Sequence, residues 1–93
     1  MIKNFEHKGL QRFFETGKTS GIQINHSQKL KLILSVLDKA KTIHDVIDVP
    51  SFRAHELKGN RAGCWSLYVN GNWRVTFYFD GKYFEIINYE DYH

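Results

Sequence analysis

The second half of the chain alternates apolar and polar residues over three segments, and two turn signals separate these segments. Alternation places every second side chain on the same face of a β-strand, so the segments predict an antiparallel meander. Asp80-Gly81 favours a two-residue hairpin turn between the last two strands. That turn would pair Phe77 with Phe84 and Val75 with Ile86 on one buried face.

The first turn signal, Asn70-Gly71, needs a different loop. A two-residue loop at this place would put the apolar residues of the two strands on opposite faces of the sheet. A three-residue loop over 70–72, with Asn72 in a left-handed conformation, keeps them on one face. The preferred register therefore pairs Val69 with Trp73, Leu67 with Val75 and Trp65 with Phe77.

This register predicts one apolar and one polar face. The apolar face would carry Trp65, Leu67, Val69, Trp73, Val75, Phe77, Phe79, Phe84 and Ile86. The polar face would carry Ser66, Tyr68, Arg74, Thr76, Tyr78, Tyr83, Glu85, Ile87 and Tyr89. Its tyrosines fit either packing or base stacking. Continuing the period of two past Tyr89 would bring Asp91 and His93 to the polar face, near Arg74.

The first half of the chain predicts two helices. Apolar residues recur at helical spacing from Leu10 until Gly17, and a second apolar stripe runs from a cap at Asn25 or Ser27 to about Lys41. The segment 2–5 alternates as a short strand would, and 43–49 predicts an irregular or short helical return. A chain of 93 residues supports one core, so we expect a single α+β domain over 1–93.

The charges favour a polyanionic partner. The net charge is +3, and the stretch from Leu57 to Phe79 contains Lys58, Arg61 and Arg74 but no acidic residue. RNA would be attracted to such a stretch through release of its counterions, although so few cations also fit an ordinary solvated surface.

The expected compartment is the cytoplasm. The single cysteine, Cys64, cannot form an intramolecular disulfide, and residues 1–6 lack the apolar core of a secretory signal. No apolar run reaches the length that spans a bilayer, so we expect no membrane partner.

Several residues have the chemistry for RNA cleavage by the 2′-hydroxyl. That reaction needs a base, an acid and positive charge near the phosphate, and it needs no metal. Histidine suits the proton transfers because its pKa lies near neutrality. The residues of these types are His55, His93, Arg74, Lys58 and Arg61. Tyr92 could donate a hydrogen bond or stack on a base, and Asp91 could orient a histidine or exchange a proton. The remaining histidines, His7, His26 and His44, are expected at the surface or at helix ends.

Metal and thiol chemistry are not indicated. The sequence has no HExxH motif and no paired cysteines, and Cys64 lies among aromatic residues without a local catalytic signature. We therefore expect neither a metal nor a small-molecule cofactor.

Three blocks in order resemble one family nearly from end to end of the chain. They are Leu57-Lys58-Gly59-Asn60-Arg61-Ala62-Gly63, Asn72-Trp73-Arg74-Val75-Thr76-Phe77 and Asn88-Tyr89-Glu90-Asp91-Tyr92-His93. Together with the opening residues 1–5 and the segment 13–21, they are similar to HigB-type toxins of the RelE superfamily. One departure is Cys64, where relatives often carry a larger or more polar residue.

The resemblance implies a microbial RNase fold, with two N-terminal helices on one face of a mostly antiparallel, roughly five-stranded sheet. It implies an mRNA endonuclease that acts in the ribosomal A site of the 30S subunit and is held inactive by a HigA-like antitoxin. The implied catalytic residues are His55, Asp91, Tyr92 and His93. Arg74 would contact the scissile phosphate, while Lys58 and Asn72 would hold the mRNA or help to select a base.

Two other classes of function stay open at this point. The chain could be a non-catalytic RNA- or ribosome-binding module whose Arg74 and tyrosines bind without cutting. It could also be a protein-interaction subunit whose cationic face docks an acidic partner. Loss of activity on replacement of His55 or His93 would distinguish the enzyme from both.

Overall fold

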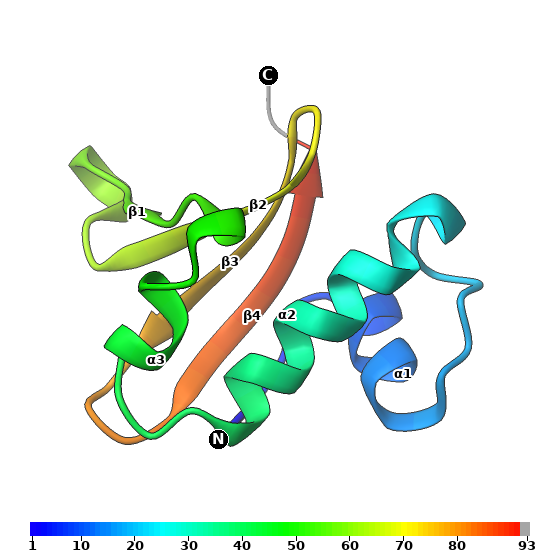
Figure 1. The fold of residues 1–93 in the computed structure, drawn as a ribbon, viewed down its shortest axis with the longest axis horizontal. Coiled ribbons are helices and arrows are strands. Elements are labelled where there is room, and N and C mark those ends of the chain that lie inside the picture. Colours follow the sequence, from blue (N-terminus) through cyan, green and yellow to red (C-terminus); the bar gives the residue numbers. More distant parts are fainter. Residues whose placement is uncertain (92–93) are drawn as a thin grey trace.

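The computed structural model describes residues 1–91. Its helices are α1 (Lys8–Thr16), α2 (Ser27–Lys39) and α3 (His44–Ile47), with short 3₁₀ helices η1 (Ile24–His26), η2 (Pro50–Phe52) and η3 (Gly59–Arg61). Its strands are β1 (His55–Glu56), β2 (Cys64–Asn70), β3 (Trp73–Phe79) and β4 (Phe84–Asp91). They form one antiparallel sheet in the order β1-β2-β3-β4 (Figure 1). The α+β class and the meander are therefore confirmed.

The N-terminal segment runs beside β4 but forms no strand of its own. Two isolated parallel bridges join Ile2 to Phe84 and Phe5 to Ile87. Backbone hydrogen bonds follow the same path, with Lys3 N donating to Phe84 O at 2.8 Å and Phe84 N donating to Met1 O at 2.9 Å. The predicted fifth strand is therefore wrong for residues 1–91, since the regular ladder has four strands.

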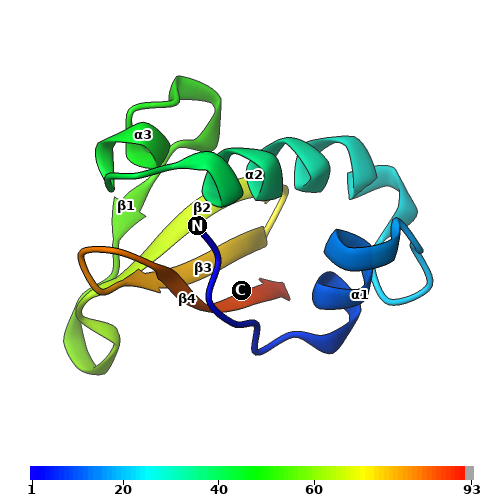
Figure 2. The same cartoon turned by 90° about the horizontal axis from the view of Figure 1, so that it is seen from below.

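Both predicted helices are present. Helix α1 ends at Gly17, which takes a left-handed conformation with φ of 81° and donates its N–H to Phe13 O. Helix α2 follows His26 in the N-cap position, one residue from each expected cap, and ends at Lys39 because Ala40 is extended. Its apolar stripe is buried and consists of Leu30, Ile33, Leu34 and Leu37. Helix α2 lies across one face of the sheet, whereas α1 lies beside the C-terminal end of β4 (Figure 2). The prediction that both N-terminal helices pack on one face is therefore correct for α2 and wrong for α1.

The β2–β3 hairpin keeps most of the predicted register. Trp65 pairs with Phe77 and Leu67 with Val75, as expected. The pairing of Val69 with Trp73 is wrong, because Asn70 takes that position and a bulge separates it from Tyr68. The turn therefore has two residues, and Gly71 rather than Asn72 is left-handed, with φ of 56°. The bulge restores the common apolar face that a two-residue loop alone would disrupt.

The predicted β3–β4 register is wrong. Phe79 rather than Phe77 pairs with Phe84, and a four-residue loop joins the strands, held by Asp80 Oδ1, which accepts from the backbone N–H groups of residues 82 and 83. Beyond Tyr78 the ladder contains a bulge on β4. Within it, Ile86 has φ of 53° and is 42% exposed, and Asn4 Oδ1 accepts its N–H at 2.6 Å.

This bulge reverses which face each following residue occupies. Ile87 and Tyr89 are buried in the core instead of lying on the polar face, and Ile86 is exposed instead of buried. Asp91 pairs with Trp73, so the prediction that Asp91 shares a face with Arg74 is wrong. The same prediction for His93 lies outside the described residues, as does Tyr92.

The core lies between α2 and the sheet. It contains Phe52, Phe77 and Phe84 as its largest fully buried side chains. Trp65 and Trp73 pack against it, which agrees with their predicted core face. Among residues 1–91, none of the helices has the length and apolar character needed to cross a bilayer.

Candidate functional site

Two cross-strand rows of side chains occupy the sheet face that points away from the apolar core, called the polar face below. The register of the four strands aligns the first row as His55, Ser66, Thr76 and Asn88. The second row is Tyr68, Arg74 and Glu90. Paired residues on adjacent antiparallel strands project to the same side, so both rows belong to one surface.

His55 and Arg74 are the predicted site residues that this register places on the polar face. His55 is exposed on the edge strand β1 and pairs with Ser66. Arg74 lies in the adjacent row on β3, about 10 Å across the sheet and about 7 Å along it, so the two backbone positions are about 12 Å apart. The edge position leaves His55 open to a long ligand.

Arg74 is held in place by the β2–β3 turn. Its Nη1 donates to Gly71 O at 2.8 Å and to Trp73 O at 2.9 Å. Its guanidinium carbon lies 5.0 Å from the centre of the Tyr68 ring. The Tyr68 hydroxyl in turn accepts the N–H of Gly71 at 3.2 Å. The turn, the ring and the guanidinium therefore form one unit that orients positive charge on the polar face.

Arg61 forms a bidentate ion pair with Glu90. Nη1 donates to Oε1 at 3.0 Å and Nη2 donates to Oε2 at 2.9 Å, while Thr76 Oγ1 also donates to Oε2 at 3.0 Å. Hydrogen bonds from Arg61 and then from Thr76 lower the pKa of Glu90, although burial opposes them. The same pair raises the pKa of Arg61. Glu90 thus fastens η3 to β4 across the polar face.

Asn88 and Glu90 are residues of the two rows that the sequence did not reveal. The uninterrupted alternation assigned the polar face to Ile87, Tyr89 and Asp91 and left Asn88 and Glu90 on the other side. Only knowledge of the bulge at Ile86 would have corrected the alternation, because the bulge shifts every later residue to the other face. The sequence gives no sign of this bulge, since it places a β-branched residue in a left-handed conformation.

The other predicted site residues lie around the polar face. Lys58 is exposed and immediately precedes η3, so it lies on the loop that the Arg61–Glu90 pair holds. Asn72 is exposed in the β2–β3 turn, two residues before Arg74. Asp91 is exposed at the end of β4 beside Trp73. Tyr92 and His93 lie outside the described residues.

An aromatic cluster supports the ends of β3 and β4, next to Arg74 and Asp91. The Trp73 and Tyr89 rings stack with centroids 4.5 Å apart, and the His26 ring meets Trp73 edge-on at 5.6 Å. His26 Nδ1 lies 2.6 Å from the Tyr89 hydroxyl, and burial lowers the pKa of His26. The expected helix-end position is correct for His26, which is also only 4% exposed.

His7 and His44 also lie at helix ends, as expected. His7 caps α1, with Nδ1 accepting the N–H of Leu10 at 2.9 Å, and burial lowers its pKa. His44 is the first residue of α3 and is exposed. Neither lies in the two rows of the polar face.

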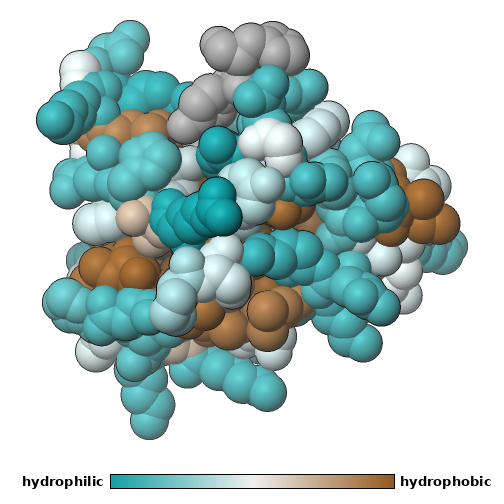
Figure 3. Space-filling model, turned by 45° about the horizontal axis from the view of Figure 1, so that its top comes forward, coloured by the Kyte–Doolittle hydropathy of each residue, from teal (hydrophilic) through white to brown (hydrophobic). Residues whose placement is uncertain are grey.

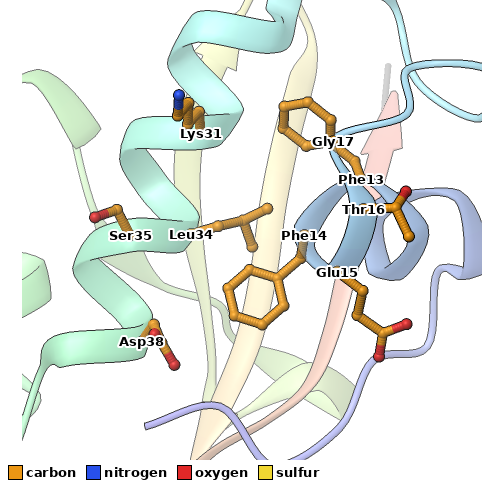
Figure 4. A pocket seen from close by; sticks show the side chains of 9 residues that line it. All are labelled: Phe13, Phe14, Glu15, Thr16, Gly17, Lys31, Leu34, Ser35 and Asp38. Atoms are coloured by element: carbon orange, nitrogen blue, oxygen red, sulfur yellow. The ribbon is translucent and has the colours of Figure 1, made fainter.

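A groove between two helices is separate from the polar face. It has a volume of about 480 Å³ and lies between α1 and α2, with Phe13, Phe14 and Leu34 among its lining residues (Figure 4). None of the predicted site residues lines it. Within residues 1–91, no three His, Cys, Asp or Glu side chains are grouped to hold a metal ion. The surface that fits the predicted chemistry is therefore the open sheet.

Figure 3 shows the face of the molecule that comes forward when the top of Figure 1 is tilted toward the viewer. Hydrophilic side chains cover most of this face, and hydrophobic side chains form smaller patches between them. The fold and the polar face together define a class: a small α+β domain whose sheet presents an exposed histidine on its edge strand and a turn-anchored arginine, with Ser66 and Thr76 buried between them. The cations on this face suit a polyanion.

Two solved structures share this fold. A mutant of YafQ from E. coli is 12% identical, with 98% of this chain and 93% of that chain covered and a TM-score of 0.57. The YoeB dimer from Staphylococcus aureus is 16% identical, with 99% and 97% covered and a TM-score of 0.56. At these identities the likeness concerns the fold alone, and it confirms the expected RelE-like fold.

Sequence relatives give the family. The model of the HigB-like toxins, described as RelE-like toxins of type II toxin–antitoxin systems, matches residues 3–93. A curated protein from Proteus vulgaris, "Endoribonuclease HigB", is 43% identical over 93 residues, which is the full length of both chains. This chain belongs to the HigB-like toxin family. The predicted resemblance and the predicted enzyme class, an endoribonuclease toxin, are confirmed at the level of the family, and membership implies an antitoxin partner.

Proposed function

We propose that this protein is an mRNA endoribonuclease that cleaves mRNA in the ribosomal A site and so inhibits translation. The observation that carries the proposal is the arrangement of His55 and Arg74 on one open face of a HigB-family domain. The 43% identical relative, named an endoribonuclease, supports the activity.

The proposed chemistry is attack of the 2′-hydroxyl oxygen on the adjacent phosphorus, which forms a 2′,3′-cyclic phosphate and breaks the bond to the 5′-oxygen of the next nucleotide. A base takes the proton of the 2′-hydroxyl, and an acid gives a proton to the leaving 5′-oxygen. His55 performs one of these two proton transfers, and Arg74 stabilises the negative charge that develops on the phosphate. Asp91, Tyr92 and His93 complete the catalytic set that the family resemblance assigns. The reaction requires no metal, because the acid, the base and the positive charge all come from side chains.

The described geometry limits how Asp91 takes part. It lies at the exposed end of β4 on the side of Trp73, so its carboxylate acts from the edge of the sheet rather than from the row of Arg74. We assign Asp91 to orienting the terminal residues.

Binding of the mRNA is assigned to residues around the scissile phosphate. Lys58 and Asn72 contact the backbone or the bases from the two loops beside the polar face. Arg61 is bound to Glu90, so its contribution is to hold the Lys58 loop and to add positive potential. With Arg74 at the scissile phosphate, all four predicted RNA-binding residues are thereby assigned to the mRNA.

The proposed biological setting follows from the family. The protein acts in the cytoplasm as a single domain over residues 1–93, on mRNA in the 30S A site. A HigA-like antitoxin holds it inactive. Neither a small-molecule cofactor nor a membrane enters this proposal.

The test is cleavage of a defined mRNA in a translating extract, with ribosomes present or removed. We expect cuts only with ribosomes, and a loss of at least about a hundredfold in rate for His55→Ala. His44→Ala is the matched control, because His44 is exposed on α3 and lies outside the polar face. Inhibition of translation by folded His55→Ala at the wild-type level would contradict the enzyme and support a non-catalytic ribosome-binding module.

A further inference from the structure

Two guanidinium groups lie beside the Tyr68 ring, that of Arg74 and that of Arg53. The guanidinium carbon of Arg53 lies 4.8 Å from the centre of the ring. Lys29, from the first turn of α2, brings its Nζ to 6.0 Å from the same centre. Three cations from three different elements thus converge on one tyrosine of the polar face.

Nothing among the described residues neutralises this added charge. None of the ion pairs formed within residues 1–91 includes Lys29 or Arg53. Lys29 Nζ donates instead to the backbone oxygen of Ser51 at 2.9 Å, which fixes it beside η2. Arg53 itself is exposed. The cluster therefore adds positive charge beside Tyr68, next to the guanidinium of Arg74.

The backbone at Arg53 is unusual for such a residue. It follows η2 in a left-handed conformation, with φ of 45° and ψ of 48°. Glycine or asparagine adopts this conformation with little strain, whereas a long side chain seldom does. Strained backbone conformations of this kind are typical of functional sites, where the side chain binds a ligand. The conformation therefore indicates a binding role for the guanidinium of Arg53.

We propose that Lys29, Arg53 and Tyr68 form a subsite for the RNA backbone next to the scissile phosphate. The inference rests on the proposed cleavage of RNA and extends it. Arg53 follows η2 and precedes His55 by two residues, so the short link from η2 to β1 keeps the two residues close along the chain. A strand that passes between His55 and Arg74 continues over Tyr68 and reaches the two further cations.

An RNA strand fits this cluster better than an acidic segment of a protein. The guanidinium fork of Arg53 matches phosphate oxygens, and an aromatic ring between cations is typical of surfaces that follow a single strand. The cluster is also continuous with the row that contains Arg74. An antitoxin segment on the same cations is the alternative that the experiment must distinguish.

The test measures mRNA cleavage in ribosome-containing extract against protein concentration, for wild type and for Arg53→Asn. Asparagine tolerates the left-handed conformation, so thermal unfolding should stay near that of wild type. We expect about a tenfold higher protein concentration for half-maximal rate, a maximal rate within about twofold of wild type, and a weaker dependence on salt. Lys29→Gln should likewise raise the protein concentration for half-maximal rate, leave the maximal rate nearly unchanged and weaken the dependence on salt. This second variant keeps the test valid if Arg53→Asn folds poorly.

The matched control is Arg12→Asn, which removes an exposed cation from α1, away from the polar face. If wild type cleaves and both cluster variants behave like this control, the subsite is wrong and the proposed function stands. If wild type cleaves no RNA, the proposed function fails, and the subsite fails with it. A loss confined to the maximal rate also contradicts the subsite. So does weaker binding of the antitoxin with unchanged cleavage, which would assign the cluster to a protein partner.

Discussion

Replacing Glu90 by Gln should destabilise the protein in a way that depends on pH. The carboxylate accepts two hydrogen bonds from Arg61, one from Thr76 and one from Asn88. Glutamine keeps the shape but loses the charge and one acceptor oxygen. The free energy of unfolding at pH 7 should fall by about 1–2 kcal/mol. Charge-assisted hydrogen bonds contribute about that much, and the Arg61 side chain, which is 40% exposed, is partly solvated once it is released.

The sign of the pH dependence follows from the pKa of Glu90. The pKa is lowered in the folded protein, so the unfolded chain takes up a proton first as the pH falls. The stabilisation is therefore complete well above the ordinary glutamate value of 4.5 and is lost as the pH falls through the folded pKa. The difference in unfolding free energy between wild type and Glu90→Gln should therefore become smaller as the pH falls from the ordinary glutamate pKa through the folded pKa of Glu90.

Urea denaturation followed by tryptophan fluorescence gives both free energies at pH 7 and at pH 3.5. Trp65 and Trp73 are partly buried against the core and so report unfolding. The reasoning fails if the two proteins differ by less than about 0.3 kcal/mol at pH 7, well below the contribution of one such hydrogen bond. It also fails if the difference at pH 3.5 equals that at pH 7.

Three further changes test the fold by the same denaturation assay. Ile86→Asn should leave stability unchanged or raise it by about 0.5–1 kcal/mol, because asparagine tolerates the left-handed bulge that strains isoleucine; a loss above about 1 kcal/mol would contradict this account. Gly9→Ala should lower the free energy of unfolding by about 1–3 kcal/mol, since the new Cβ would lie 2.4 Å from the backbone oxygen of Gly21. A more stable variant, as the helix propensity of alanine alone would give, would show that the contact with Gly21 relaxes freely. Tyr89→Phe should cost about 1–3 kcal/mol, because it leaves His26 Nδ1 buried without its hydroxyl partner, and an unchanged midpoint would show that water replaces it.

Sequence patterning predicted the elements well but not their exact register. The helices followed from apolar periodicity and from Gly17, and two pairs of the β2–β3 ladder were correct because hydrophobic parity constrains them. The two bulges were not predictable, because a bulge inserts one residue without a residue type that requires it. At Ile86 the residue type even argues against the observed conformation.

The errors at the site have the same origin. The bulge at Ile86 exchanged the faces of all following residues, so Asp91 moved away from the row of Arg74 and Glu90 took the place beside it. Parity placed Arg74 correctly because the bulge on β4 does not change the face of residues on β3, whereas His55 was named from its residue type and from the family resemblance and not from parity. Arg53 escaped notice because it lies between elements, where alternation carries no information.

The chemical ends left by cleavage distinguish attack by the 2′-hydroxyl from attack by water. mRNA cut by the purified protein on ribosomes should carry a 2′,3′-cyclic phosphate or a 3′-phosphate, because the 2′-hydroxyl of the substrate is the proposed nucleophile. New 3′-hydroxyl ends would instead indicate attack by water, of the kind that metal ions commonly assist. That result would contradict a reaction performed by His55 and Arg74 on the polar face.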